Sequence, residues 1–324
     1  MLGTITRRVL AMVPLLIAVA LLTFLLAHFS QGDFLSELNA NPQISPETID
    51  LMRRQYGLDR PWHAQFLGWL GGVLRGDFGH SLACNCPVSG LVAERVANTV
   101  ALAVAGLALA LAVALPLGVI APGLRWRGPD RALSALSSLL LSTPSFLLAL
   151  LAVVLAARTG WFPIGGTRSI ESGDLTGAAR ISDYLHHLVL PATVLALRQA
   201  PAYWRQMRAG IVESLSQDYI VTARAKGLPP ARVLFRHAMG NALNPIVTMF
   251  GGSVGSLLSG AFIVETIMSW PGLGSLAVSS LLSRDLNALL ACLLLAAALL
   301  AGGNLLADLL LAATDPRIRR PRAI

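Results

Sequence analysis

The sequence predicts an all-α, polytopic membrane protein. Hydrophobic residues make up 55% of the 324 residues and charged residues only 13%, whereas soluble domains carry about 25% charged residues. Several apolar runs reach the roughly 20 residues that a helix needs to cross the hydrocarbon core of a bilayer. The low charge content and these runs exclude an ordinary soluble domain and predict membrane-spanning helices.

Six apolar segments are long enough to be membrane spans. The first follows Arg7 and Arg8, and its apolar run exceeds the roughly 7–15 residues usual in a signal peptide, so we interpret it as an uncleaved helix. The fourth is the least regular, because Pro191, Arg198 and Pro201 interrupt it. The predicted spans are residues 9–29, 99–121, 132–157, 185–203, 245–266 and 287–312.

The basic residues lie mainly on one side of these spans, at the N-terminus, in the loop after the second span, in the long loop after the fourth and in the tail. Residues 32–98, on the other side, mix acids and bases. The positive-inside rule then places both termini in the cytoplasm. We expect the chain to reside in a bacterial-type plasma (inner) membrane. The net charge of +8 comes mainly from basic residues that flank the spans on one side of the membrane. We therefore predict that the chain lies in a lipid bilayer and has no nucleic-acid partner.

The chain divides into an N-terminal span with an external segment, residues 1–98, and a core membrane domain, residues 99–324. The external segment is too long for a turn, and Ser45 followed by Pro46 is typical of a helix start. Trp62, Phe66 and Trp69 have helical spacing. We therefore expect short external helices over the outer mouth, with the tryptophans as interfacial anchors.

The loop at residues 205–244 is the most informative segment. Ser214 with Gln217 fits a capping box, and Asp218 is a second possible N-cap. Gly227 and the Pro229-Pro230 pair predict the end of a short helix. The residues predicted to form this helix and its end are Asp218, Tyr219, Thr222, Ala223, Arg224, Ala225, Lys226 and Gly227.

Two interpretations of this short helix compete. Small residues at Ala223 and Ala225 would let it sit deep in a protein groove, with Leu215, Tyr219 and Lys226 on the same side. Alternatively, it is an amphipathic helix on an anionic bilayer surface. It offers few bulky apolar residues to lipid, so we favour a groove on a soluble partner.

The chain lacks a nucleotide-binding P-loop. Lys226 is the only lysine, and it stands between Ala225 and Gly227 rather than in a Gly-Lys-Ser/Thr sequence. Energy from ATP would therefore have to come from another subunit.

The loop resembles the EAA-type loop of ABC-transporter permeases of the dipeptide/oligopeptide/nickel family. Further matching segments precede and follow it in the family's order, so that the resemblance covers nearly the whole chain. The matching residues are Gln55–Asp59, Pro61, Gly76–Gly79, Ser81, Gln217–Tyr219, Thr222–Leu228, Arg236–Ala238, Asn241–Leu243, Pro245, Glu265–Thr266, Ser269–Gly274, Arg284–Asp285, Asn304–Leu306, Asp308 and Asp315–Arg319.

This resemblance implies the type I ABC importer permease fold and a subunit that forms a translocation path without catalysing a reaction. It implies a second homologous permease subunit, two ABC ATPase subunits that each receive a loop helix, and an extracytoplasmic substrate-binding protein. ATP and Mg would be bound by the ATPase subunits, with no cofactor on this chain. Di- or oligopeptides are the implied cargo, while nickel chelates, glutathione-like compounds and other small solutes stay open.

The sequence departs from the family pattern at three places. Asn244 stands where an aliphatic residue is expected, and Leu286-Asn287-Ala288 replaces a run containing Tyr-Pro. The Cys84-Asn85-Cys86 insert is unfamiliar. The two cysteines are either a soft-metal or redox pair or two small loop residues, and we favour the latter.

Three charged residues lie in or near the predicted spans, and we treat them as candidates for a translocation path or gate. Arg198 falls inside the fourth span, where charge usually faces a bundle interior or cavity. Glu265 is a candidate for contact with a substrate amine, and Asp308 for lining the path. The simpler roles are a helix-end hydrogen bond for Glu265 and an inner-face ion pair for Asp308, and we prefer them because each residue lies near the end of a span.

Other functions have weaker support. Ser253 lies in a G-x-S-x-G match, but within an apolar span where close helix packing explains the glycines better than a hydrolase elbow. His186-His187 lacks the spacing of a zinc site. An autonomous secondary transporter would show internal repeats, and a membrane enzyme would show paired catalytic groups in its spans. Neither feature is evident in the sequence.

Overall fold

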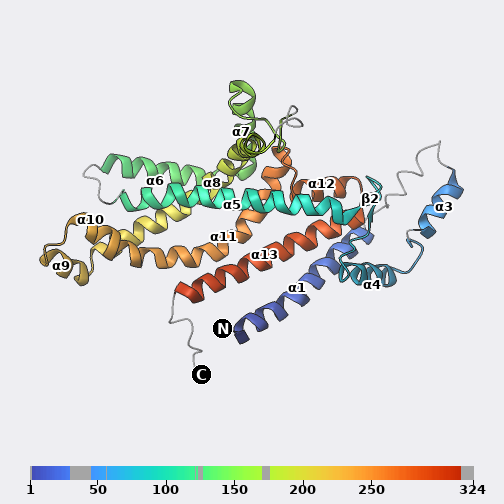
Figure 1. Cartoon of the computed structure of the whole chain (residues 1–324), viewed down its shortest axis with the longest axis horizontal. Helices are drawn as coiled ribbons and strands as arrows, with labels where there is room; N and C mark the ends of the chain where they lie inside the picture. The colour runs from blue at the N-terminus through green and yellow to red at the C-terminus, as the bar shows by residue number, and fades with distance from the viewer. Residues whose placement is uncertain are drawn as a thin grey trace. The chain divides into compact units, whose positions relative to one another are not determined.

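The computed structural model describes residues 2–29, 45–55, 57–120, 122, 127–169 and 176–314. These residues are almost entirely helical (Figure 1). The described strands, β1 (His80–Ser81) and β2 (Cys86–Pro87), form a two-stranded antiparallel hairpin. The predicted all-α class is confirmed.

The helices differ widely in length, from one turn to 38 residues. They are α1 (Leu2–Phe29), α3 (Pro46–Gln55), α4 (Trp62–Val73), α5 (Val88–Ile120), α6 (Arg127–Ser142), α7 (Ser145–Thr159), α8 (Ala178–Leu215), α9 (Asp218–Ala225), α10 (Pro230–Arg232), the π-helix η3 (Val233–Ala238), α11 (Met239–Ile267), α12 (Leu273–Leu282) and α13 (Leu286–Thr314).

The chain forms two compact units. One contains Val100–Trp270 and the segment that begins at Gly302, and the other contains Leu2–Thr99 and Pro271–Ala301. The boundary predicted after residue 98 lies beside one of these divisions. The sequence did not indicate that residues 271–301 group with the N-terminal part.

Three of the described helical segments are long and apolar enough to cross a membrane: Arg8–Phe29, Val88–Ile120 and Leu286–Leu309. The number rises to five if each of two bent helix pairs is counted as one span. The α6–α7 pair, which covers the span predicted at 132–157, turns by 105° and is therefore two helices rather than one continuous helix. Pro144 causes the break, because its extended backbone precedes α7 and its ring cannot continue α6.

The fourth predicted span lies within the longest helix, α8. Its 38 residues extend about 57 Å, nearly twice the roughly 30 Å hydrocarbon core of a bilayer. It does not meet the length and composition criteria that the other described spans meet. The helix therefore supplies both a predicted membrane segment and a long extension that leads to α9.

Close backbone contacts pack α8 into its unit. A Cβ atom at Gly106 would lie 2.8 Å from Leu195 Cβ, and one at Gly118 would lie 2.7 Å from Met207 Cβ. Because real Cβ atoms do not approach this closely, the close approach of α5 to α8 at these two positions requires glycine. Tyr203, Met207 and Ile211 of α8 are completely buried in the resulting core.

Ser253 of the G-x-S-x-G match lies within α11, not on a strand-to-helix turn. Its Oγ accepts a 2.6 Å hydrogen bond from the Tyr203 hydroxyl and donates to the Met249 carbonyl at 3.0 Å. A Cβ at Gly303 of α13 would collide with Val254 of α11. The serine and the small residues therefore serve helix packing.

The other unit contains the predicted external helices. Ser45 Oγ accepts the Thr48 amide at 3.3 Å, which confirms the predicted cap of α3. Phe66 of α4 packs on Phe24 of α1 with ring centroids 5.5 Å apart.

Cys84 and Cys86 are joined by a disulfide, so the preferred interpretation of two small loop residues is wrong.

Candidate coupling surface

The short helix predicted in the basic loop is α9, which lies with α10 at one end of α8 and α11 (Figure 1). The predicted capping box is wrong, because Ser214 is a buried residue of α8. The N-cap of α9 is Gln217, and within the described residues no side chain caps it. Asp218 is instead the first helical residue, where its negative charge interacts favourably with the positive N-terminal end of the helix dipole.

The end of α9 follows the prediction. Gly227 has a φ of +74°, the left-handed conformation that favours glycine. The Gly227 amide donates to the Arg224 carbonyl at 2.9 Å and the Leu228 amide to the Ala223 carbonyl at 3.4 Å, which together form a Schellman motif. Pro230 then occupies the first position of α10, so the proline pair ends one helix and begins the next.

One side of α9 packs against the protein itself. Ile220 and Ala223 are buried in the core of their unit, whereas the other predicted residues of the helix lie at its surface. The small side chain of Ala223 therefore faces the chain's own core, and the fit of α9 into a partner's groove stays a prediction. Helical spacing predicted that α9 has two sides but did not indicate which one faces the chain's own core.

A polar contact adds to this attachment. Asn241 Nδ2 of α11 donates to the Tyr219 hydroxyl at 2.8 Å. Tyr219 nevertheless stays 39% exposed. Tyr219 thus joins α9 to α11 while keeping part of its apolar face available.

The exposed surface of this end combines apolar and basic side chains. Val221 is 62% exposed and Phe235 is 54% exposed, and Arg224 and Lys226 are exposed on α9. We call Tyr219, Val221, Arg224, Lys226 and Phe235 the coupling surface. Val221 and Phe235 were not among the predicted site residues. They stand among several other apolar residues of the loop, so their sequence positions do not mark them as exposed.

Phe235 belongs to η3, a π-helical turn that follows directly after α10. Such turns are rare and occur often at functional sites. This π-helical turn was not predicted, because one extra residue in a helical turn leaves the local composition unchanged.

Two arginines of α8 connect this end to α6. Arg208 makes a bidentate ion pair with Asp130, and Arg205 Nη2 donates to Ser138 Oγ at 2.7 Å. The hydrogen bonds from Arg208 lower the pKa of the Asp130 carboxyl below its usual value. The sequence showed these arginines only as basic loop residues, since Asp130 lies 78 positions from Arg208 and Ser138 lies 67 positions from Arg205.

The three path or gate candidates lie on different helices of the same unit. Arg198 is exposed midway along α8, while Glu265 is completely buried near the end of α11. Asp308 is partly buried in the last third of α13. Burial leaves the Glu265 carboxylate inside the protein in this conformation.

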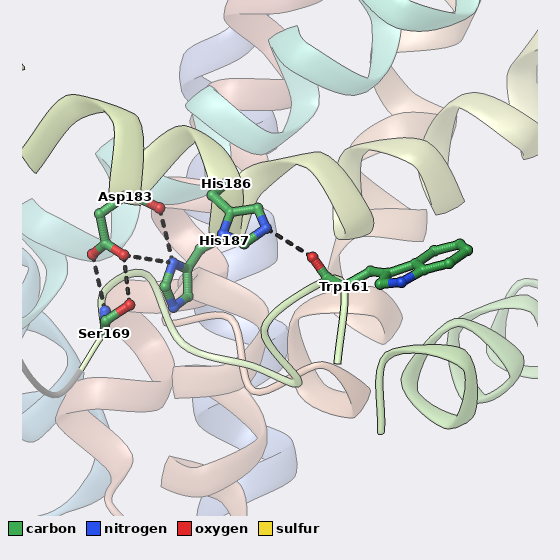
Figure 2. Close-up of polar contacts among 5 residues, drawn as sticks. All are labelled: Trp161, Ser169, Asp183, His186 and His187. Atoms are coloured by element: carbon green, nitrogen blue, oxygen red, sulfur yellow. Dashed lines mark hydrogen bonds and ion pairs between the residues drawn. The ribbon is translucent and has the colours of Figure 1, made fainter. Parts of the chain in front are cut away.

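At the other end of α8, a polar cluster organises the loop after α7 (Figure 2). Ser169 donates to Asp183 from its amide at 2.9 Å and from its hydroxyl at 2.6 Å. His187 Nδ1 lies 2.8 Å from the Asp183 carbonyl oxygen, and His186 Nε2 lies 3.0 Å from the Trp161 carbonyl oxygen. The two histidines thus contact backbone carbonyls, and the described residues hold no cluster suited to a metal.

Comparison with known proteins places these features in a family. The family model for the binding-protein-dependent transport system inner membrane component matches residues 97–320, and the model for the N-terminal part of such components matches residues 1–114. The chain is 38% identical over 316 residues to the oligopeptide transport system permease protein AppB of Bacillus subtilis, covering 97% of this chain and 98% of that protein.

Other relatives agree. The chain is 38% identical over 318 residues to a putative peptide permease protein of Brucella ovis, covering 97% of this chain and 98% of that protein. It is 36% identical over 320 residues to the glutathione transport system permease protein GsiC of Salmonella choleraesuis, covering 98% and 99%. The chain therefore belongs to the family of inner membrane components of binding-protein-dependent transport systems and is an ABC-transporter permease subunit.

Proposed function

We propose that this permease carries di- or oligopeptides, or a related small solute such as a glutathione-like compound, into the cell. The proposal rests on the names of relatives that align over almost the entire chain, which are oligopeptide, peptide and glutathione permeases. An extracytoplasmic binding protein would deliver the cargo, and a second homologous permease subunit would complete the path.

The coupling surface is where an ABC ATPase subunit docks. The observation that carries this proposal is the one-sided burial of α9: Ile220 and Ala223 attach it to the core, while Val221, Arg224 and Lys226 remain outside. A partner that moves α9 would thereby also move α8 and α11. This assignment puts the α9 end and both termini in the cytoplasm.

The ATPase subunits bind ATP and Mg, and this chain binds neither. A ligand shifts a conformational equilibrium only through its different affinity for the two states. ATP binding would draw two ATPase subunits together, and the docked α9 helices would follow. The spans then alternate between outward and inward openings.

Arg198 faces the translocation path. An exposed arginine at mid-helix is costly in hydrocarbon and is tolerated beside water or an anionic partner. Its exposure on α8 fits a residue that meets the carboxylate of a passing peptide. Glu265 and Asp308 stay candidates for a gate rather than for direct substrate contact, because they are buried or partly buried.

The experiment is reconstitution of the complex in proteoliposomes with the Arg224→Glu variant. The reversed charge on the coupling surface should abolish ATPase binding and ATP-driven uptake of a labelled dipeptide. Arg180→Glu is the matched control, because Arg180 is an exposed arginine at the opposite end of α8, and it should keep both activities. Normal ATPase docking in the Arg224→Glu complex contradicts the proposal, and uptake without any ATPase would instead indicate an autonomous secondary transporter.

A further inference from the structure

A disulfide closes the turn between β1 and β2. Cys84 and Cys86 are separated by one residue, with Cα atoms 5.4 Å apart. Asn85 between them has a φ of +52°, a left-handed conformation that asparagine adopts more readily than most residues. Cys84 is exposed and Cys86 is partly exposed, so the disulfide is open to attack from solution.

The hairpin is fastened to α13 through the buried carboxylate of Asp285. One carboxylate oxygen, Oδ1, accepts the Ala288 amide at 3.2 Å and caps the first turn of α13. The other, Oδ2, accepts the Ser81 hydroxyl and the Ala83 amide, the latter at 3.3 Å. Ser81 Oγ in turn accepts the Cys84 amide at 3.3 Å. The chain of contacts thus runs from the disulfide to a helix N-terminus.

The position of Asp285 is fixed by the end of α12. Arg284 has a φ of +54°, and its amide donates to the Leu281 carbonyl at 3.2 Å, while the Asp285 amide donates to the Ser280 carbonyl at 2.8 Å. This Schellman motif ends α12 and leads directly into the cap of α13.

A second contact joins the same two segments. Asn287 Nδ2 donates to the His80 carbonyl at 2.9 Å, and a Cβ at Gly79 would lie 3.1 Å from the Asn287 side chain. Asn287 therefore adds a second hydrogen bond between β1 of the hairpin and the start of α13.

We propose that the Cys84–Cys86 disulfide is a thiol-exchange site whose redox state controls the docking of this hairpin on the start of α13. This proposal depends on the proposed function for two points only. They are that the disulfide lies outside the cytoplasm, where disulfides persist, and that its redox state affects transport. Oxidised, the disulfide fixes the turn that presents the Ala83 and Cys84 amides to Asp285 and Ser81. Reduced, the turn gains conformational freedom and these hydrogen bonds open more often.

The reaction is exchange with a dithiol. A thiolate of the dithiol attacks the exposed Cys84 sulfur, and Cys86 leaves as a thiolate that takes up a proton. The second thiol of the reductant then attacks the mixed disulfide, so the Cys84 thiol is released and the reductant departs as a disulfide. Two electrons and two protons pass to the cysteine pair. Cys292 is buried in α13 and does not compete.

The test is hydrogen exchange of the full-length protein in its complex, with and without dithiothreitol. In the reduced protein, amides of residues 81–88 should exchange about tenfold faster, the change that releasing so short a closed loop predicts. The Cys84→Ser/Cys86→Ser variant should match the reduced protein and ignore dithiothreitol. Ser81→Ala should speed exchange with the disulfide intact, whereas Ser283→Ala, a neighbouring hydroxyl bonded to carbonyls of α12, should not.

Two results would overturn the proposal: free thiols at both cysteines after purification in air, or unchanged exchange in residues 81–88 after reduction verified by mass. Transport is measured separately. Peptide uptake by the wild type should fall on reduction, and uptake by the double-serine variant should not respond. If no peptide is transported in either redox state, the cargo assignment fails while the exchange result still decides the redox proposal.

Discussion

Arg208 and Asp130 are joined by two parallel hydrogen bonds, from Nε to Oδ1 at 2.5 Å and from Nη2 to Oδ2 at 2.6 Å. The pair links the start of α6 to the part of α8 that leads into α9. It lies ten residues before α9, in the last turns of α8, and only Ser216 and Gln217 separate the two helices. The fork geometry needs arginine, since lysine offers a single point charge.

Replacement of Arg208 by lysine should therefore lower stability without abolishing folding. Both partners are partly exposed, so the loss should stay below about 1 kcal/mol. Thermal unfolding in detergent measures it. Arg180→Lys, an arginine exposed at the other end of α8, should leave the melting temperature unchanged. An equal loss in both variants would show that the ion pair contributes nothing specific.

The same pair predicts a dependence of stability on pH. Arg208 lowers the pKa of the Asp130 carboxyl in the folded protein, so the folded state holds this proton less tightly than the unfolded chain. The contribution of this ion pair to stability is fully present above the pKa of about 3.9 that the carboxyl has in the unfolded chain. It is lost as the pH falls through the lower pKa of the folded protein. Asp130→Asn should reduce this acid-side loss, and identical acid unfolding curves for both proteins would contradict the assignment.

Gly227 should resist substitution for a conformational reason. Its φ of +74° costs a residue with a side chain about 1 kcal/mol or more, although no described atom lies within 4 Å of a Cβ built there. Gly227→Ala should thus destabilise the end of α9 and weaken coupling of ATP hydrolysis to uptake. Gly240→Ala is the control, because Gly240 is equally uncrowded but lies in α11 with ordinary helical φ. It should be neutral or stabilising.

Gly118→Ala tests the packing of α5 on α8. The added Cβ would lie 2.7 Å from Met207 Cβ and 3.1 Å from the Trp204 carbonyl oxygen, so the helices must separate at a cost of about 1–3 kcal/mol. Gly90→Ala, in the same helix with no described atom within 4 Å of its Cβ, should not destabilise. Similar unfolding of both variants would show that α5 does not pack as described.

The sequence predicted those features that depend on local chemistry. Gly227 and the proline pair end α9 because one residue favours positive φ and the others cannot continue a helix. The helix-breaking effect of Pro144 is equally local, but the apolar run across it concealed a turn of 105°. Composition alone does not distinguish a straight span from two helices.

Features that depend on distant partners could not be predicted. Ala223 proved to face inward because Ile220 and the core of α8 and α11 lie on that side. The Arg208–Asp130 pair and the contact of Asn287 with His80 join residues far apart in the chain. Helical periodicity reports that a side is apolar or small, but only the fold decides what covers it.

The docking of an ATPase subunit on the coupling surface is tested most directly by photocrosslinking from position 221. Val221 is 62% exposed on α9, so a photoreactive residue there should crosslink to the ATPase subunit in the assembled, transport-active complex. The same residue at Val189, 44% exposed on α8, should not. Crosslinks from position 221 to lipid alone, in a complex that still couples ATP hydrolysis to uptake, would contradict the account.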